Sequence, residues 1–270
     1  MPALVLHPSK SLMVGSGGSP VIDMRMKLVG IDTPEPRFPE GLSSQRYDEA
    51  LLRLPATAPF QNLPGELRKH LESRLEGAGT RQKKWSLPAK HALERIVEDG
   101  LRVEGNPSPA PPLPKGEGAT VKKKGKRRKL FLAVGRESFD CYGRLLAYVA
   151  PYMSREEREQ EGHPETFNLR MVREGWAVSC IHGGNMPKIK DLALVVSAVK
   201  EARREMRGFW AEREKILHGY EFRALVRMAR GEKGFRYRVA DLRDHLLGRS
   251  MHLLPAEEYI SIDEEYRVFY

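Results

Sequence analysis

Cysteine is scarce in this sequence, whose 270 residues include two, Cys141 and Cys180. Two cysteines exclude the disulfide framework of small secreted domains, and without a Cys-x-x-Cys pair or histidines at zinc-ligand spacing no structural zinc site is expected. Long hydrophobic runs are also missing, since no stretch approaches the roughly 18 apolar residues of a membrane-spanning helix. The start, MPALVLHPSKSLMV, has no basic segment ahead of an apolar one, so no signal peptide is predicted. These absences favour a cytoplasmic or nuclear protein without a membrane partner.

The composition otherwise suits a folded chain with a substantial core, because 40% of the residues are hydrophobic and 30% are charged. There are 46 Lys and Arg against 36 Asp and Glu, which gives a formal net charge of +10. The run KKKGKRRK at residues 122–129 carries seven of these positive charges and leaves about +3 for the remainder. The basic total therefore indicates a polyanionic partner less strongly than its size suggests. The run itself is compatible with a solvated loop, a nucleic-acid-binding arm or a nuclear localisation patch.

The first thirty residues favour strands. Short apolar pieces at 3–6 and 11–14 are followed by a turn rich in glycine, serine and proline. Residues 21–31 predict a longer strand, which ends at the turn DTPEP because two prolines cannot continue the ladder of backbone hydrogen bonds.

Helical spacing is clearest in the middle of the chain. Leu67, Leu71 and Leu75 recur every four residues and predict a short amphipathic helix. A second helix is expected over about 87–98, with Ser86 and Pro88 as its start signals.

Residues 106–129 join a proline-rich stretch to the basic run and predict a disordered surface loop. Strands are expected again at 130–134 and 145–150, and helices at 166–174 and 191–207. Beyond residue 210 a helical pattern is followed by a strand-like one.

Four local motifs follow one another along the chain: KLVGIDTPEP from residue 27, DCYGRLLAYV from 140, NLRMVREGWA from 168 and EARREMRGFW from 201. Together they resemble the staphylococcal-nuclease-like (thermonuclease) family. The resemblance covers roughly residues 3–210, except for insertions at 37–80 and 106–129, and leaves 211–270 as a C-terminal extension. It implies an α+β fold, a five-stranded OB-fold-type β-barrel with about three packed helices.

The resemblance also implies a nuclease that hydrolyses phosphodiester bonds in DNA or RNA with a divalent metal. Such attack builds negative charge on the phosphate oxygens, so the site needs a hard cation, positive clamps and a base for water. Transferred by position, Asp32 and the carbonyl of Thr33 would bind Ca²⁺ or another divalent ion. Glu35 would be the general base, and Arg144 would clamp the phosphate.

Two positions depart from the family pattern. Lys10 stands where the family has its first metal-binding Asp, and Lys27 stands where it has the other clamp arginine. Arg25 lies two residues earlier on the same strand face and is an alternative clamp. Exchanging a carboxylate for an ammonium changes the local charge by about two, and a unit charge 4 Å away is worth about 4 kcal/mol at a dielectric constant near 20. That is enough to expel a weakly held Ca²⁺. Two alternatives follow: Asp23 replaces the missing metal ligand, or the ammonium of Lys10 takes the place of the cation.

Each candidate residue also has an ordinary structural interpretation, since Asp32 can accept backbone N–H bonds in its turn and Arg144 can bond to turn carbonyls. Three functions therefore stay open. The first is a thermonuclease-like phosphodiesterase, and the second is a non-catalytic OB-type module that binds single-stranded nucleic acid. The third is a scaffold for protein partners, with a contact surface formed by the helix near 66–76 and the tail after 211. The residues expected to contact nucleic acid are Lys10, Tyr142, Lys122, Lys123, Lys124, Lys126, Arg127, Arg128 and Lys129.

Overall fold

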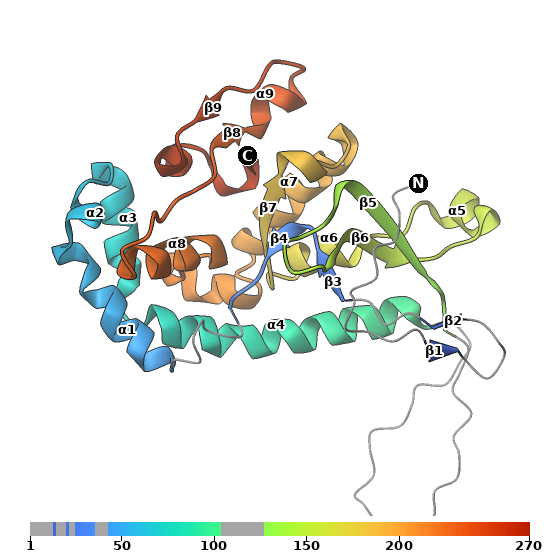
Figure 1. The fold of residues 1–270 in the computed structure, drawn as a ribbon. Helices are drawn as coiled ribbons and strands as arrows, with labels where there is room; N and C mark the ends of the chain where they lie inside the picture. Colours follow the sequence, from blue (N-terminus) through green and yellow to red (C-terminus); the bar gives the residue numbers. More distant parts are fainter. Residues whose placement is uncertain (1–12, 15–19, 22–24, 36–42, 104–126) are drawn as a thin grey trace, which may run out of the picture.

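The computed structural model describes residues 13–14, 20–21, 25–35, 43–103 and 127–270 (Figure 1). The expected mixed α+β class is confirmed, because helices and β-sheets are both present. The strands form sheets of two, five and three strands, and within the described residues none of these sheets closes on itself. The closed five-stranded barrel stays a prediction. None of the described helices combines the length and the apolar character needed to span a bilayer.

The three sheets draw on strands that are far apart in the sequence. The two-stranded sheet pairs β1 (Met13–Val14) with β2 (Pro20–Val21). In the three-stranded sheet, β6 (Leu145–Pro151) lies between β3 (Met26–Leu28) and β5 (Leu130–Phe139). The five-stranded sheet has the order β4 (Gly30–Asp32), β7 (Val178–His182), β10 (Arg267–Phe269), β8 (Val239–Asp241) and β9 (Leu253–Leu254). The C-terminal extension therefore supplies three strands of this sheet.

The strand expected over 21–31 is divided between two sheets. Lys27 pairs in parallel with Leu146 of β6, whereas Ile31 pairs antiparallel with Ser179 of β7. The change of sheet occurs at Gly30, whose φ of 74° lies in the left-handed region that favours glycine. A Cβ at this position would also lie 2.8 Å from the hydroxyl oxygen of Tyr148.

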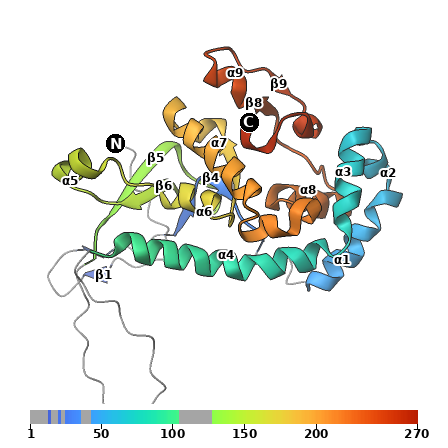
Figure 2. The ribbon, with the colours of Figure 1, turned by 180° about the vertical axis from the view of Figure 1, so that it is seen from behind.

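The helices outnumber the three that the family resemblance implies. Helix α4 extends along one side of the molecule, past α6 and α8 (Figure 2). The remaining helical segments include the 3₁₀ turns η2 to η6. The bounds are α1 (Ser44–Leu52), η2 (Leu54–Ala56), α2 (Ala58–Gln61), α3 (Gly65–Leu75), α4 (Ala78–Leu101), α5 (Arg155–Glu161), α6 (Phe167–Arg173), η3 (Gly183–Asn185), α7 (Ile189–Arg204), η4 (Gly208–Lys215), α8 (Gly219–Ala229), α9 (Leu242–Leu246), η5 (Ala256–Ser261) and η6 (Glu264–Tyr266).

Helix α3 agrees with the helix expected from Leu67, Leu71 and Leu75, all three of which are buried. The expected start of the next helix is wrong, because α4 begins at Ala78 and continues through Pro88. An interior proline removes one backbone hydrogen bond and costs about 3 kcal/mol. The buried residues of α4 on both sides of the proline offset this cost by packing against the rest of the protein. They are Ala78, Gly79, Gln82, Ser86, Ala89, Ala92 and Ile96.

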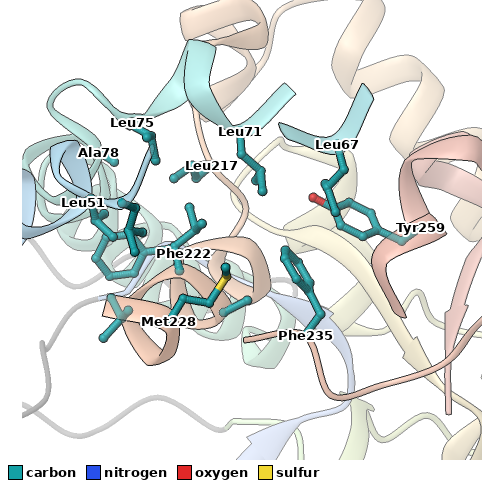
Figure 3. Packing of buried hydrophobic residues seen from close by; sticks show 14 of the residues in the cluster. Leu51, Leu67, Leu71, Leu75, Ala78, Leu217, Phe222, Met228, Phe235 and Tyr259 are labelled. Carbon is teal, nitrogen blue, oxygen red and sulfur yellow. The ribbon is translucent and has the colours of Figure 1, made fainter. Parts of the chain in front are cut away.

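The insertion at 37–80 and the tail after 211 share a hydrophobic cluster (Figure 3). The three leucines of α3 face Leu217 and the aromatic side chains of the tail, and α1 also packs against α8. The scaffold hypothesis assigns its contact surface to the helix near 66–76 and the tail after 211, and the apolar residues of these segments are buried against each other. The buried members are Tyr47, Leu51, Leu54, Phe60, Leu67, Leu71, Leu75, Ala78, Cys180, Leu217, Phe222, Ala224, Leu225, Val226, Met228, Phe235, Val239, Tyr259, Ile262 and Phe269.

A buried carboxylate, Glu221 of α8, links the two segments by polar contacts. Its oxygens accept hydrogen bonds from the hydroxyl of Tyr259 at 2.7 Å and from the backbone N–H of His218 at 2.8 Å. The ring Nε2 of His70, on α3, lies 2.9 Å from the same carboxylate. Burial raises the pKa of Glu221, but His218 and His70 outweigh this effect and hold the pKa well below its ordinary value. The group is therefore ionised and fully paired inside the protein.

The neighbouring ion pair of His218 with Glu264 predicts a loss of stability in alkali. Burial lowers the pKa of His218, but Glu264 and Glu221 outweigh burial and raise it above 6.5. The stabilisation is therefore complete below about pH 6.5 and is lost as the pH rises through the folded-state pKa. We expect the urea midpoint to fall between about pH 6 and pH 9, and to fall less in His218→Gln. Circular dichroism measures both midpoints, with the exposed His163→Gln as the control; equal pH slopes in wild type and His218→Gln would contradict the prediction.

Candidate functional site

The turn that follows β4 holds the two candidate carboxylates, Asp32 and Glu35. The backbone N–H of Glu35 donates a 2.8 Å hydrogen bond to Oε1 of Gln82, a fully buried side chain of α4. The amide of Gln82 in turn donates a 2.6 Å bond to the carbonyl of Leu217. One glutamine thus connects the turn to the segment that leads into α8.

Arg223 of α8 lies between these carboxylates. Its two terminal nitrogens donate to both oxygens of Asp32 at 3.0–3.1 Å, and its Nη1 also donates to Oε1 of Glu35. The side chain of Asp32 is 12% exposed, that of Glu35 is 22% exposed and that of Arg223 is 41% exposed. The forked geometry is the strong arrangement for an arginine–carboxylate pair.

The beginning of α8 is packed directly against the same turn. A Cβ on Gly219 would lie 2.6 Å from Oδ2 of Asp32 and 2.8 Å from the carbonyl oxygen of Thr33. Only a residue without a side chain fits there unless the turn moves. The two expected metal ligands, Asp32 and the Thr33 carbonyl, are therefore in contact with α8, the helix that contains Arg223.

The electrostatics of this triad favour a positively charged arginine. Burial opposes the charge of Arg223, but Asp32 and Glu35 outweigh burial and raise the arginine's pKa above its ordinary value. Burial raises the pKa of Glu35, and the opposing effect of Arg223 does not bring it back to 4.5. Asp32 adds to this rise through repulsion between the two carboxylates.

A divalent metal does not fit the residues that the family resemblance assigns to it. Both oxygens of Asp32 already accept from the guanidinium, and the Thr33 carbonyl faces Gly219. A bound cation would have to displace Arg223. In the part of the chain that the structure describes, no group of three or more His, Cys, Asp or Glu side chains could hold a metal ion. Lys10 stands at the position of the family's first metal-binding Asp, and Asp23 is the residue that could replace that ligand. Both lie outside the described residues.

Of the two expected clamps Lys27 and Arg25, Lys27 on β3 lies close to this triad. It is exposed, and it contributes to lowering the pKa of Glu35. Burial lowers the pKa of His182, and Lys27 lowers it further. Arg25, also exposed, accepts a 2.9 Å hydrogen bond at its backbone carbonyl from the N–H of Leu145. Lys27 thus places a positive charge near the turn, and Arg25 lies beside the start of β6.

Arg144 bonds within its own loop. Its Nε and Nη2 both lie 2.7 Å from Oδ2 of Asp140, and its guanidinium carbon lies 5.2 Å from the centre of the Tyr142 ring. Burial raises the pKa of Asp140, but hydrogen bonds from Arg144 and Tyr142 outweigh it and lower that pKa overall. Within the described part of the chain, Arg144 has no hydrogen bond or ion pair with Asp32 or Glu35. Tyr142 is 74% exposed.

The basic run is only partly described. Lys122, Lys123, Lys124 and Lys126 lie outside the described residues. Arg127 pairs with Glu98 of α4 at 3.5 Å, and Arg128 pairs with Glu157 of α5 at 2.6 Å. Lys129 is exposed. Two of the expected nucleic-acid contacts therefore connect the chain to neighbouring helices.

Sequence reasoning missed Arg223, which lies outside all four motifs. The only local signal was the apolar spacing of α8, whose buried side chains include Phe222, Leu225 and Val226. That spacing predicts a helix with one face in the core. It carries no information about which carboxylates the opposite face meets, since Arg223 and Asp32 are 191 residues apart.

Comparison with known protein families matches residues 116–212 to the model described as staphylococcal nuclease homologue. The matched range contains β5, β6, α6, β7 and α7. Asp32 and Glu35 precede it, and Arg223 follows it. A search of the curated proteins finds no match to the chain.

Proposed function

We propose that this chain, whose residues 116–212 match the staphylococcal nuclease homologue family, works as a nucleic-acid-binding module that does not hydrolyse its ligand through a calcium site. One observation carries this proposal: Arg223 lies between Asp32 and Glu35 and bonds to both. A catalytic metal needs open carboxylate oxygens, and a general base is weakened when a cation is bonded to it. The guanidinium bonds to both oxygens of Asp32 and to one oxygen of Glu35.

The binding half of the proposal is supported by the surface beside this triad. Lys27 is exposed near the triad, the exposed Arg25 and the partly exposed Arg144 lie beside the start of β6, and Tyr142 offers a ring on which a base can stack. These three cations can contact phosphates of one strand. The proposed ligand is therefore single-stranded DNA or RNA, held in the manner of an OB-type fold.

Thermonuclease-like hydrolysis is the second candidate. It is favoured by the raised pKa of Glu35, since a general base works best when its pKa approaches the operating pH. This activity requires Arg223 to leave the carboxylates.

Cleavage and binding assays on one purified preparation separate the two candidates. Wild type and Glu35→Gln are incubated with single- and double-stranded DNA and RNA, in Ca²⁺, Mg²⁺, Mn²⁺ or chelator. We expect no metal-dependent cleavage, and single-strand binding that persists in chelator. With three phosphate contacts, affinity should fall about 20-fold between 50 and 200 mM salt.

Substitutions on the cationic surface provide the matched controls. Lys27→Gln should weaken single-strand binding several-fold and reduce its salt dependence, whereas Lys69→Gln, an exposed lysine of α3, should leave both unchanged. Metal-dependent cleavage that Glu35→Gln abolishes would overturn the binding-module proposal in favour of the hydrolase. Cleavage that persists in Glu35→Gln would indicate a contaminating nuclease.

A further inference from the structure

A cavity of about 390 Å³ opens between the insertion, the end of α7 and the C-terminal extension. It involves neither Asp32 nor Glu35, and Arg223 does not line it. Its volume is at the lower end of the range of small-molecule sites, large enough for one ligand of mononucleotide size. The chemistry of this cavity is independent of the proposed function.

Cationic groups dominate one part of the cavity wall. They come from three separate segments, so the site exists only in the folded chain. The basic side chains are His70, Arg74, Arg203, His218 and Arg267, and the acidic ones are Asp263 and Glu264.

Carboxylates pair with four of the five basic side chains. Glu264 is shared among His218, Arg203 and Arg267, and its distances to the two arginines are 3.7 and 3.8 Å. Arg203 also lies 3.3 Å from Glu265, and His70 lies 2.9 Å from Glu221. Arg74 is the exception among the basic residues of the wall.

Arg74 bonds to neutral oxygens alone in the part of the chain that the structure describes. Its Nη1 donates to the carbonyl of His70 at 2.7 Å and to the hydroxyl of Ser73 at 2.9 Å. Among the described residues it has no carboxylate partner. A guanidinium bonded only to neutral oxygens in a partly enclosed wall is suited to bind an anion.

Apolar side chains form the rest of the wall: Met206, Trp210, Ile216, Ile260 and Ile262. The guanidinium of Arg203 lies 5.6 Å from the centre of the Trp210 ring, so the cationic and apolar parts meet there. Trp210 is 7% exposed, and its indole N–H has no hydrogen-bond acceptor in the described part of the chain. An aromatic wall residue beside a cation suits a ligand that joins a flat ring to an anionic group.

We propose that this cavity binds a phosphorylated heteroaromatic ligand the size of a mononucleotide. Its phosphate contacts Arg74 and Arg203, and its ring lies against Trp210. The same chemistry is offered by a free mononucleotide and by the 5′-phosphorylated end of a nucleic-acid strand. The experiment distinguishes these sources.

The test is calorimetric titration of the full chain with AMP, adenosine, inorganic phosphate and a 5′-phosphorylated dinucleotide. We expect saturable binding of AMP and at least tenfold weaker binding of adenosine and of phosphate alone. Arg74→Gln should weaken AMP binding at least tenfold, because it removes the charge that has no carboxylate partner. Arg68→Gln is the matched control, since Arg68 lies on the same helix and bonds to Gln61, and it should bind AMP like wild type.

Thermal unfolding of each variant shows whether it is folded before it is titrated. Lys69→Gln, at an exposed position of α3 outside the cavity wall, should leave AMP binding unchanged. If the dinucleotide binds better than AMP and loses affinity in Arg74→Gln, the ligand is a strand end. Absence of saturable binding of both probes to the folded wild type would overturn the proposal, and so would unchanged binding in a folded Arg74→Gln variant.

Discussion

Replacing Arg223 with glutamine is expected to destabilise the protein and to make its stability respond to Ca²⁺. The variant leaves Asp32 and Glu35 facing each other without the cation that separates them. Losing one partner of a buried ion pair costs about 3–5 kcal/mol, and the 41% exposure of Arg223 reduces the expected loss to about 2 kcal/mol. Two unpaired carboxylates beside the Thr33 carbonyl then offer oxygen ligands to a divalent ion.

Differential scanning calorimetry with increasing CaCl₂ measures both effects. We expect the melting temperature of wild type to be insensitive to Ca²⁺, and that of Arg223→Gln to rise. A tenfold excess of Ca²⁺ over the dissociation constant is worth about 1.4 kcal/mol. Arg236→Gln is the control, because Arg236 forms an exposed pair with Glu232 that contributes less than about 1 kcal/mol. Equal stabilisation of wild type and Arg223→Gln by Ca²⁺ would show that Arg223 does not exclude the ion.

Glu221→Ala is expected to destabilise the protein more than Arg223→Gln does. The change leaves the Tyr259 hydroxyl, the ring of His70 and the backbone N–H of His218 without their buried acceptor. Unsatisfied buried groups cost about 1–3 kcal/mol each, and their partial relaxation leaves an expected loss of about 4 kcal/mol. At 2–4 °C per kcal/mol for a chain of this size, the melting temperature should fall by roughly 10 °C.

Two further variants test the origin of this loss. Glu221→Gln keeps an acceptor for Tyr259 but removes the charge opposite His70, so it should lose roughly half as much. Glu72→Ala, at an exposed position of α3, should change stability by less than about 0.5 kcal/mol. A melting temperature of Glu221→Ala within 2 °C of wild type would contradict the role given to this carboxylate.

Glu221 also contributes to the loss of protein stability in acid. Its folded-state pKa is lowered, so its stabilisation is present above about pH 4.5 and is lost as the pH falls toward the folded-state pKa. The acid limb of the stability curve should therefore be shallower in Glu221→Gln than in wild type.

Sequence patterns predicted the secondary structure correctly where interactions between neighbouring residues determine it. The leucines of α3 recur at the period of a helix, and that period is independent of the rest of the chain. The start of α4 could not be predicted in this way, because burial on both sides of Pro88 outweighs the local preference of proline. The division of residues 26–32 between two sheets depends on the distant partners β6 and β7.

The candidate site was likewise predictable only in part from the sequence. Four motifs in the sequence resemble the staphylococcal-nuclease-like family, and residues 116–212 match its model. The sequence also places Asp32 and Glu35 in one short turn, and neighbouring residues in a turn are close in any fold. Which cation those carboxylates meet depends on the tertiary structure. The shared core of α3 and α8 holds the C-terminal extension against the turn, and Arg223 thereby occupies the position between the two carboxylates.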